Sequence, residues 1–346
     1  MIKKILTKDN FSNFVNGLIG DNDVYAPITK NEVISYKKIS KADEIVAEFL
    51  NSNIPPKSIF FPQKDVLFTY EKRNGDVILE DAFQKGKPKI VFGIRPCDAS
   101  SFKLLDNFFN FGKFKDKNYL DRRKDSIIIG LGCNTPRKTC FCTSVGGNPF
   151  EKENVDIFLV DLEDKYLVEG ITEAGSNIIN NNDLFQDAIQ GDIEKAEALS
   201  KKVTEEMKIV TDMKDVTKKL DNLYDDPMWK DISMKCIRCG SCSFLCPTCH
   251  CFDVIDENID KRKGRRVRIW DTCQFPLFTL HGSGHNPRPD KKMRARQRIY
   301  HKFNYYDKMY GLCGCVGCGR CIQCCPSNSD IRETFETICA GGMKND

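Results

Sequence analysis

The sequence lacks any long hydrophobic run. Within its 346 residues, no apolar segment approaches the roughly 20 residues that a membrane-spanning helix needs. Residues 1–20 contain Lys3 and Lys4 but lack the apolar core of a secretory signal peptide. We therefore expect a soluble, cytoplasmic protein without a membrane span.

Charge of one sign is not in excess either. The 53 Lys and Arg residues nearly balance the 49 Asp and Glu residues, which leaves a formal net charge of +4. This balance gives no global argument for nucleic-acid binding, and we expect no nucleic-acid partner. Basic residues do gather locally, and we interpret them as a solvated helix face, with compensation of an anionic metal centre, docking of an acidic partner or nucleic-acid binding as alternatives. They are Lys261, Arg262, Lys263, Arg265, Arg266, Arg268, Lys291, Lys292, Arg294, Arg296 and Arg298.

Common nucleotide-binding and hydrolytic motifs are missing. The pair Gly130-x-Gly132 lacks the third glycine of the dinucleotide fingerprint, and no P-loop, serine elbow or H-E-x-x-H is present. His281 and His285 are four residues apart, but two glycines between them disfavour the helix that would align them on a metal. The chain therefore shows no flavin, nicotinamide or nucleotide site, and we expect no catalytic residues.

Cysteine, in contrast, is abundant, with 18 residues. Two runs share the spacing C-x2-C-x2-C-x3-C-P, in which three close thiolates wrap one [4Fe–4S] cluster and the fourth binds the other cluster of a pair. The sequence thus predicts two cross-ligated [4Fe–4S] clusters that move single electrons. The runs are Cys236, Cys239, Cys242 and Cys246, and Cys315, Cys318, Cys321 and Cys325.

Structural zinc is the main alternative, because paired C-x2-C units also build zinc ribbons. Zinc needs only four sulfurs per ion and has no use for a third cysteine at the same two-residue step. Disulfides are not expected, because a reducing compartment keeps thiols free. We therefore favour iron–sulfur clusters.

Four cysteines lie nearer the N-terminus. Cys97 and Cys133 each follow a short predicted strand, and Cys140 and Cys142 occupy the next loop. We expect both strands in one sheet, so the four thiols would converge at one sheet edge. There they would hold a third [4Fe–4S] cluster or a zinc ion, and the alternative is buried, inert cysteine.

Three cysteines crowd just after the first run: Cys249, Cys251 and Cys273. They are candidates for neighbours that tune a cluster, for substitute ligands, or for plain buried cysteines. The remaining ones, Cys313, Cys324 and Cys339, have no place in a cluster scheme.

Hydrophobic periodicity predicts two domains. Residues 1–224 are expected to form an α+β or α/β domain, and residues 225–346 a mainly α-helical, ferredoxin-like domain that holds the two clusters. A charged helix with Ile193, Ala196 and Val203 on one face leads to the boundary. The other expected elements are a helix from Asp9 to Gly20, a strand at 32–38, a helix near 41–50, a hairpin about Asn74-Gly75, strands at 90–94 and 127–129 with a helix at 100–108 between them, and a hairpin of 157–160 with 166–168.

Longer segments resemble a known family. They are Cys246-Pro-Thr-Cys-His-Cys251, Arg268-Ile-Trp-Asp-Thr-Cys-Gln-Phe275, Gly284-His-Asn-Pro-Arg-Pro289, Cys315-Val-Gly-Cys-Gly-Arg-Cys321, Pro96-Cys97-Asp98 and Cys140-Phe141-Cys142. These segments resemble the iron–sulfur β subunit of cytoplasmic sulfhydrogenases and the A subunit of anaerobic sulfite reductase. The resemblance covers nearly the whole chain.

This resemblance implies an electron conduit in an anaerobic oxidoreductase complex. The partners would be a flavoprotein subunit that uses NAD(P)H and a terminal hydrogenase or reductase subunit. A free-standing ferredoxin-like carrier, a subunit of a heterodisulfide-reductase-type complex and a zinc module remain as alternatives. The implied ligands are Cys236, Cys239, Cys242 and Cys325 for one cluster and Cys315, Cys318, Cys321 and Cys246 for the other, and the family shares cysteines at Cys97, Cys133, Cys140, Cys142, Cys249, Cys251 and Cys273.

Overall fold

The computed structural model describes residues 2–46, 48–84, 86–207, 209, 213 and 215–342. Its strands are β1 (Ile2–Thr7), β2 (Asp23–Lys30), β3 (Val33–Lys38), β4 (Lys64–Arg73), β5 (Asp76–Asp81), β6 (Lys89–Ile94), β7 (Ile127–Leu131), β8 (Ile157–Asp161), β9 (Lys165–Gly170), β10 (Gln186–Asp187), β11 (Phe252–Asn258) and β12 (Lys263–Trp270). Its α-helices are α1 (Lys8–Ile19), α2 (Pro96–Phe109), α3 (Lys117–Arg123), α4 (Glu173–Asn180), α5 (Gln190–Glu206), α6 (Val216–Asp221), α7 (Met228–Ile232), α8 (Ser241–Phe244), α9 (Lys291–Tyr300), α10 (Tyr306–Tyr310), α11 (Arg320–Gln323) and α12 (Ile331–Cys339). Short 3₁₀ helices span Ala42–Glu44, Pro56–Ile59 and Cys142–Val145, and a π-helical turn spans His301–Tyr305.

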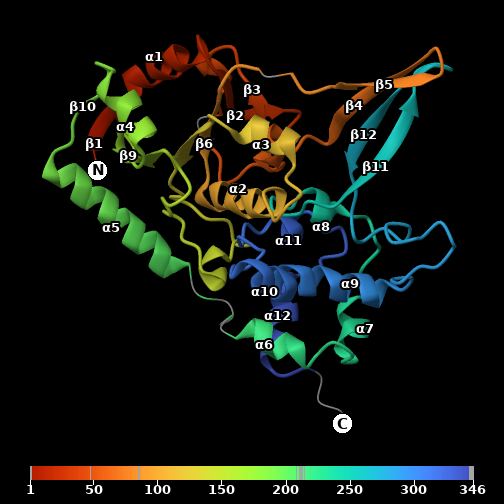
Figure 1. Cartoon of the computed structure of the whole chain (residues 1–346). Coiled ribbons are helices and arrows are strands. Elements are labelled where there is room, and N and C mark those ends of the chain that lie inside the picture. The colour runs from red at the N-terminus through yellow and green to blue at the C-terminus, as the bar shows by residue number, and fades with distance from the viewer. Residues whose placement is uncertain are drawn as a thin grey trace.

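A large mixed sheet forms the upper half of the molecule (Figure 1). Its strand order is β10-β1-β9-β8-β7-β6-β2-β3, and β2, β6, β7 and β8 run parallel to one another in its centre. The continuous apolar runs of β6 and β8 are typical of strands that are buried on both faces. Side chains of α1 and α4 pack in one buried cluster, and side chains of α2 and α5 pack in the other. The expected α/β organisation of this half is confirmed.

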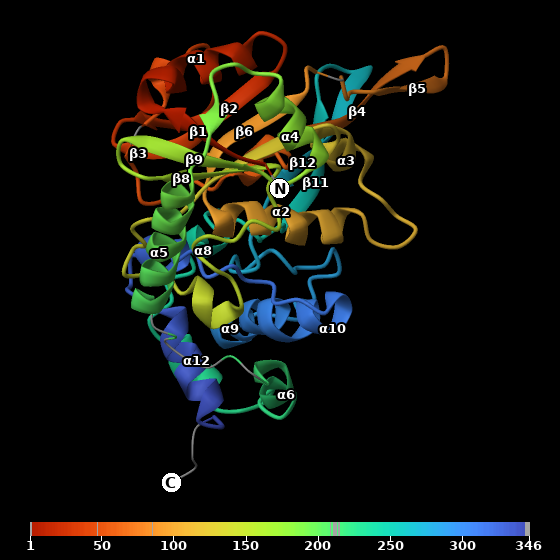
Figure 2. The same cartoon turned by 90° about the vertical axis from the view of Figure 1, so that its left-hand side faces the viewer.

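Several local expectations are confirmed as well. The first helix begins after Thr7, whose hydroxyl oxygen accepts from the backbone N–H of Asn10, so Thr7 rather than Asp9 is the N-cap. Asn74-Gly75 joins β4 to β5, and β8 pairs with β9. The helix α5 buries Ala196 and Val203 as expected, and Figure 2 shows it running from the large sheet down toward α12.

The expectation of a helix near 41–50 is wrong. Only Ala42–Glu44 form a short 3₁₀ helix, and residue 47 lies outside the described residues. The backbone turns extended at Ile45, and the N–H of Val46 donates to the carbonyl of Pro27 in β2 at 2.9 Å. Pairing with the strand therefore replaces the helical hydrogen bonds that propensity alone favours.

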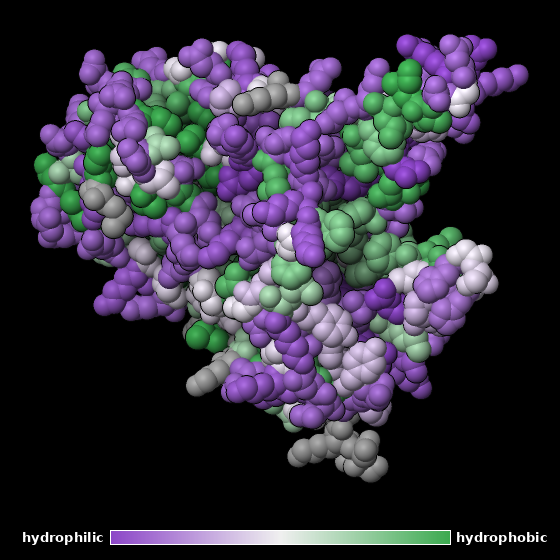
Figure 3. All heavy atoms as spheres, viewed as in Figure 1, coloured by the Kyte–Doolittle hydropathy of each residue, from purple (hydrophilic) through white to green (hydrophobic). Residues whose placement is uncertain are grey.

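The C-terminal part is less helical than expected. Strands β11 and β12 form an antiparallel hairpin, and β12 also pairs with β4. Strands from both sides of the predicted domain boundary therefore share the sheet β11-β12-β4-β5. This sheet projects from the body as an arm (Figure 1), and its surface carries a hydrophobic patch (Figure 3) where Val77 and Leu79 of β5 are exposed. Valine and isoleucine at alternate positions of β12 favour the strand, but intervening arginines hide the pattern.

The first half of the basic set is not a helix face, whereas the second half, from Lys291 to Arg298, lies on the helix α9. Arg265 and Arg266 lie on β12 and pair with Glu257 and Asp256 across the hairpin. Arg268 is buried and pairs with Asp65 of β4 and with Asp116. Its charge is therefore neutralised within the arm. Among the described residues, no helix is both long enough and apolar enough to cross a membrane.

Candidate metal centres

Three thiols of the first run share a cavity with two thiols of the second. Cys236, Cys239 and Cys242 line this cavity together with Cys321 and Cys325, whereas Cys324 does not. Gly240, with a φ of 78°, lets the chain turn sharply into α8, which carries Cys242. Gly319, with a φ of 73°, allows the same sharp turn into α11, which carries Cys321 of the second run. The two runs thus repeat one local fold.

The fourth thiol of the first run lies on the opposite side, with the second run. Burial raises the pKa of Cys315 to about 12, and the thiol of Cys246 is close enough to raise it further. Burial followed by Cys246 likewise raises the pKa of Cys318, and the pKa of Cys321 is raised by burial and then by Cys315, Cys318 and Cys246. Cys246 therefore lies among Cys315, Cys318 and Cys321. The exchange of fourth cysteines that the spacing implies matches these positions.

Three buried cations surround these thiols. The ammonium of Lys302 donates to the sulfur of Cys246 at 3.2 Å, to the hydroxyl of Thr248 at 2.6 Å and to the carbonyl of Gly314 at 3.1 Å. Arg298 donates to the carbonyl of Cys242 at 3.2 Å, and Lys57 to the carbonyl of Cys249 at 2.9 Å. Lys57, Lys302 and Arg298 are only 2%, 5% and 8% exposed.

No carboxylate pairs with Lys57, Arg298 or Lys302 in the part of the chain that the structure describes. A buried charge without a counter-charge costs several kcal/mol. Burial opposes the charge of Lys302, yet the thiolates of Cys246 and Cys249 raise its pKa well above its usual value. Burial lowers the pKa of Lys57, in contrast. Anionic sulfur, as in clusters with four thiolate ligands, would balance the charge of Lys302.

The four N-terminal cysteines lie beside the second run. Cys97 follows β6 and Cys133 follows β7, at the same edge of the large sheet, as expected. The thiol of Cys140 lies 3.8 Å from the carbonyl oxygen of Cys318. Burial raises the pKa of Cys142 to about 12, and nearby Cys140 and Cys133 raise it further. Cys133, Cys140 and Cys142 are therefore neighbours, and Cys140 also contributes to the raised pKa of Cys97, whose main cause is burial.

Two glycines allow this close approach. A Cβ at Gly317 would lie 2.5 Å from the backbone of Cys142, and one at Gly319 would lie 2.4 Å from the carbonyl oxygen of Thr139. The backbone N–H of Phe141 donates to the carbonyl of Gly317 at 2.8 Å. The loop that carries Cys140 and Cys142 is thus pressed directly onto the second run.

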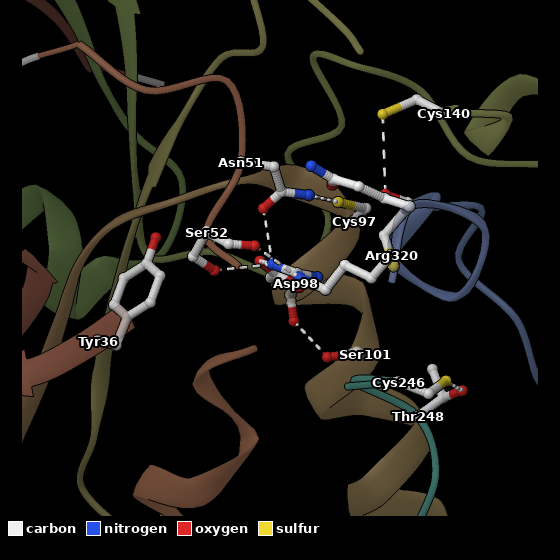
Figure 4. Close-up of polar contacts among 12 residues, drawn as sticks. Tyr36, Asn51, Ser52, Cys97, Asp98, Ser101, Cys140, Cys246, Thr248 and Arg320 are labelled. Carbon is white, nitrogen blue, oxygen red and sulfur yellow. Dashed lines mark hydrogen bonds and ion pairs between the residues drawn. The ribbon is translucent and has the colours of Figure 1, made fainter. Parts of the chain in front are cut away.

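A buried ion pair joins the second run to helix α2, which follows β6 of the large sheet (Figure 4). The guanidinium of Arg320 donates to both carboxylate oxygens of Asp98, at 2.6 and 2.7 Å. It also donates to the carbonyl of Ser52 at 2.8 Å and to the side-chain oxygen of Asn51 at 2.7 Å. Arg320 is 2% exposed and Asp98 is fully buried. This pair fixes Cys318 and Cys321 relative to Cys97.

Cys249, Cys251 and Cys273 line a separate small cavity, together with Lys302 and Arg298. A hydrogen bond from the Cys251 thiol lowers the pKa of Cys273 to about 6, and the same contact raises the pKa of Cys251. The thiol of Cys249 contacts that of Cys246 and lowers its pKa. These three cysteines therefore adjoin the two runs without lining the cavity of the first.

The other predicted positions fall outside these groups. His281 and His285 lie in an exposed loop, joined by a backbone hydrogen bond of 2.8 Å. Cys313 lines a different cavity, beside Cys97, Cys142 and Cys315. Across the described ranges, no three His, Cys, Asp or Glu side chains lie close enough to hold a single metal ion.

Comparison with known proteins decides the family. Residues 235–329 match the model of a 4Fe-4S dicluster domain. The chain is 31% identical over 337 residues to the protein named sulfhydrogenase 2 subunit beta of Pyrococcus furiosus, which covers 97% of this chain and 98% of that relative. The chain belongs to the sulfhydrogenase β-subunit family. No solved structure matches it.

As a sulfhydrogenase β-type chain, it is an iron–sulfur subunit of a larger complex, and its role is electron transfer. The expected resemblance is thereby confirmed. Sequence reasoning missed Lys57 and Lys302, which carry no local signal because only the fold brings them to the thiols. Arg298 is one of the basic residues interpreted as a solvated helix face, but it is buried. Arg320 lies within the second cysteine run, and its ion pair with Asp98 was not predicted.

Proposed function

We propose that this chain relays electrons, within a cytoplasmic and anaerobic complex, between a flavoprotein subunit that uses NAD(P)H and a terminal catalytic subunit of the hydrogenase type. The observation that carries the proposal is the position of Cys325 in the cavity lined by the first run, with Cys246 beside the thiols of the second run, which supports two neighbouring cluster sites. The family relationship supports the complex and the electron transfer. A separate flavin subunit is required by the proposal, because the sequence shows no flavin motif.

Each proposed cluster draws ligands from both runs. One site uses Cys236, Cys239 and Cys242 with Cys325, and the other uses Cys315, Cys318 and Cys321 with Cys246. A bound [4Fe–4S] cluster supplies a reversible one-electron couple. The chain's own contribution is to hold the thiolates, exclude water and place Lys302 and Arg298 near the negative charge.

We place a third [4Fe–4S] cluster at Cys97, Cys133, Cys140 and Cys142. The contact of Cys140 with Cys318 favours this site, because it puts the third cluster directly beside the second one. The three proposed cluster sites would then follow one another in space, from the N-terminal site to the site of the second run and then to the site of the first run. We treat residues 1–224 and 225–346 as two domains that hold this chain of sites together through the Asp98–Arg320 pair and the shared arm.

Cluster binding is tested with two adjacent cysteines. Cys325 lines the first cavity and Cys324 does not, although the two are neighbours in sequence. Cys325→Ser is expected to lower the iron and acid-labile sulfide content of the reconstituted protein by one cluster, while Cys324→Ser keeps the wild-type content. Equal losses in both variants, or none in either, would contradict the ligand assignment.

The relay is tested by anaerobic purification of a tagged copy under gentle conditions. A flavoprotein and a nickel–iron subunit are expected to accompany the chain in fixed ratio. A sirohaem protein in place of the nickel–iron subunit would instead assign sulfite reduction. Recovery of the chain alone would contradict the relay and would support a free-standing carrier.

A further inference from the structure

The base of the β11–β12 hairpin brings two cysteines together that neither cluster site uses. The backbone N–H of Asp271 donates to the carbonyl of Cys251 at 3.0 Å, directly after the last strand pair of Phe252 with Trp270. Cys273 follows two residues later, and both thiols face the same small cavity. The hairpin geometry thus places Cys251 and Cys273 beside each other on the wall of one small cavity.

Hydrogen bonds hold Cys273 in a defined orientation. The side-chain amide of Gln274 donates to its sulfur at 3.3 Å, and the same amide also donates to the carbonyl of Arg294 at 3.0 Å. The hydroxyl of Ser243 lies 3.9 Å from that sulfur. Ser243 directly follows Cys242, so the thiol is beside the first cluster site.

The second cluster site is equally close. Lys302, which donates to the sulfur of Cys246, lines the cavity that Cys251 and Cys273 share. Cys249 lines it as well and contacts Cys246. The pair therefore lies between two sites that each exchange one electron.

We propose that Cys251 and Cys273 form a reversible dithiol–disulfide couple that stores two electrons beside the two single-electron clusters. The inference rests on the proposed function only for the identity of the electron acceptors. On oxidation, an S–S bond forms between the two sulfurs, and the dithiol loses two protons to solvent and two electrons. Each of the two neighbouring oxidised clusters takes up one of these electrons. Reduction reverses every step.

Differential thiol labelling of the full-length, cluster-loaded protein tests the couple. The protein is poised anaerobically in dithiothreitol redox buffers, quenched in acid, and alkylated with a light reagent. It is then reduced, alkylated with a heavy reagent and mapped by mass spectrometry. We expect Cys251 and Cys273 to acquire the heavy label together, with a tenfold change in the oxidised-to-reduced ratio per 29.6 mV, the slope of a two-electron couple. Cys313 and Cys324 serve as internal controls and stay light at every potential.

Electron counting supplies an independent readout. In a reductive titration, the wild-type protein is expected to take up two more electrons per chain than Cys273→Ser at equal iron content. Two results overturn the couple. One is the absence of heavy label at Cys251 and Cys273 at every potential. The other is the loss of one cluster's iron in both Cys251→Ser and Cys273→Ser, which would make them cluster ligands. A chain that binds no iron contradicts the proposed function instead, and its labelling still tests the couple.

Discussion

The ammonium of Lys302 lies 3.2 Å from the sulfur of Cys246, in a site that excludes water and offers no carboxylate among the described residues. Hydrogen bonds and positive charge at a cluster sulfur stabilise the reduced, more negative state. The lysine is therefore expected to favour reduction of the cluster that we propose Cys246 to ligate. The other proposed site has Arg298 at the carbonyl of Cys242 rather than at a sulfur.

Replacing Lys302 by methionine is expected to lower the potential of one cluster. The change removes the charge and the hydrogen bond but keeps most of the side-chain volume, so the oxidised-to-reduced ratio should shift about tenfold, equivalent to about 59 mV for one electron. A redox titration followed by electron paramagnetic resonance measures the shift. Lys302→Arg keeps the charge and should remain close to wild type. An unchanged potential in Lys302→Met would refute the electrostatic role.

Removal of iron is expected to destabilise the C-terminal part of the chain. Lys57, Arg298 and Lys302 would then lose the anionic centres that balance them, and unpaired buried charge costs several kcal/mol. Thermal unfolding before and after chelation measures the loss. The double substitution Lys57→Met with Lys302→Met should reduce the difference in unfolding temperature between the iron-loaded and iron-free protein, because it removes two of the three buried charges. An undiminished difference would show that charge balance is not its cause.

Breaking the ion pair between Arg320 and Asp98 is expected to loosen the second run from the large sheet. Removing one partner of a buried pair costs about 3–5 kcal/mol, so Arg320→Ala should lower the free energy of unfolding by that order. The matched control is Lys103→Ala, whose pair with Glu153 is exposed and should contribute less than about 1 kcal/mol. Denaturant unfolding of both variants provides the comparison, and equal effects would contradict the clamp.

A third cluster at the N-terminal site would raise the iron content of the protein. Three [4Fe–4S] clusters require about twelve iron atoms per fully reconstituted chain, whereas two require about eight. Cys140→Ser should remove about four, because Cys140 is central to its group, and Cys339→Ser serves as the control outside every group. A wild-type content near eight would refute the third cluster while leaving the other two in place.

The sequence predicted those parts of the site that depend on local spacing. The spacing of the two cysteine runs predicts their ligands, and the positions of Cys97 and Cys133 just after two strands follow from short apolar runs. Apolar runs likewise predicted β3, β6, β7, β8 and β9 of the large sheet, but not β1, β2 or β10. Local patterns thus account for the thiols and for the scaffold beneath them.

The parts that sequence could not predict depend on long-range contacts. Lys302 reaches Cys246, and Arg320 reaches Asp98, across separations in the chain that no local pattern records. The hairpin of 252–270 was missed because its arginines read as a solvated helix. Their partners, among them Asp65, lie on another strand or across the hairpin. Pairing with those residues, rather than propensity, decided the structure.

Electron throughput in the intact complex tests the central claim most directly. Cys242→Ala removes a thiolate from the first cavity without touching a partner subunit. The account predicts that NAD(P)H-linked turnover falls to background, while the terminal subunit keeps its activity with an artificial electron-donor dye. Full NAD(P)H-linked turnover in a variant that has lost this cluster would contradict the relay.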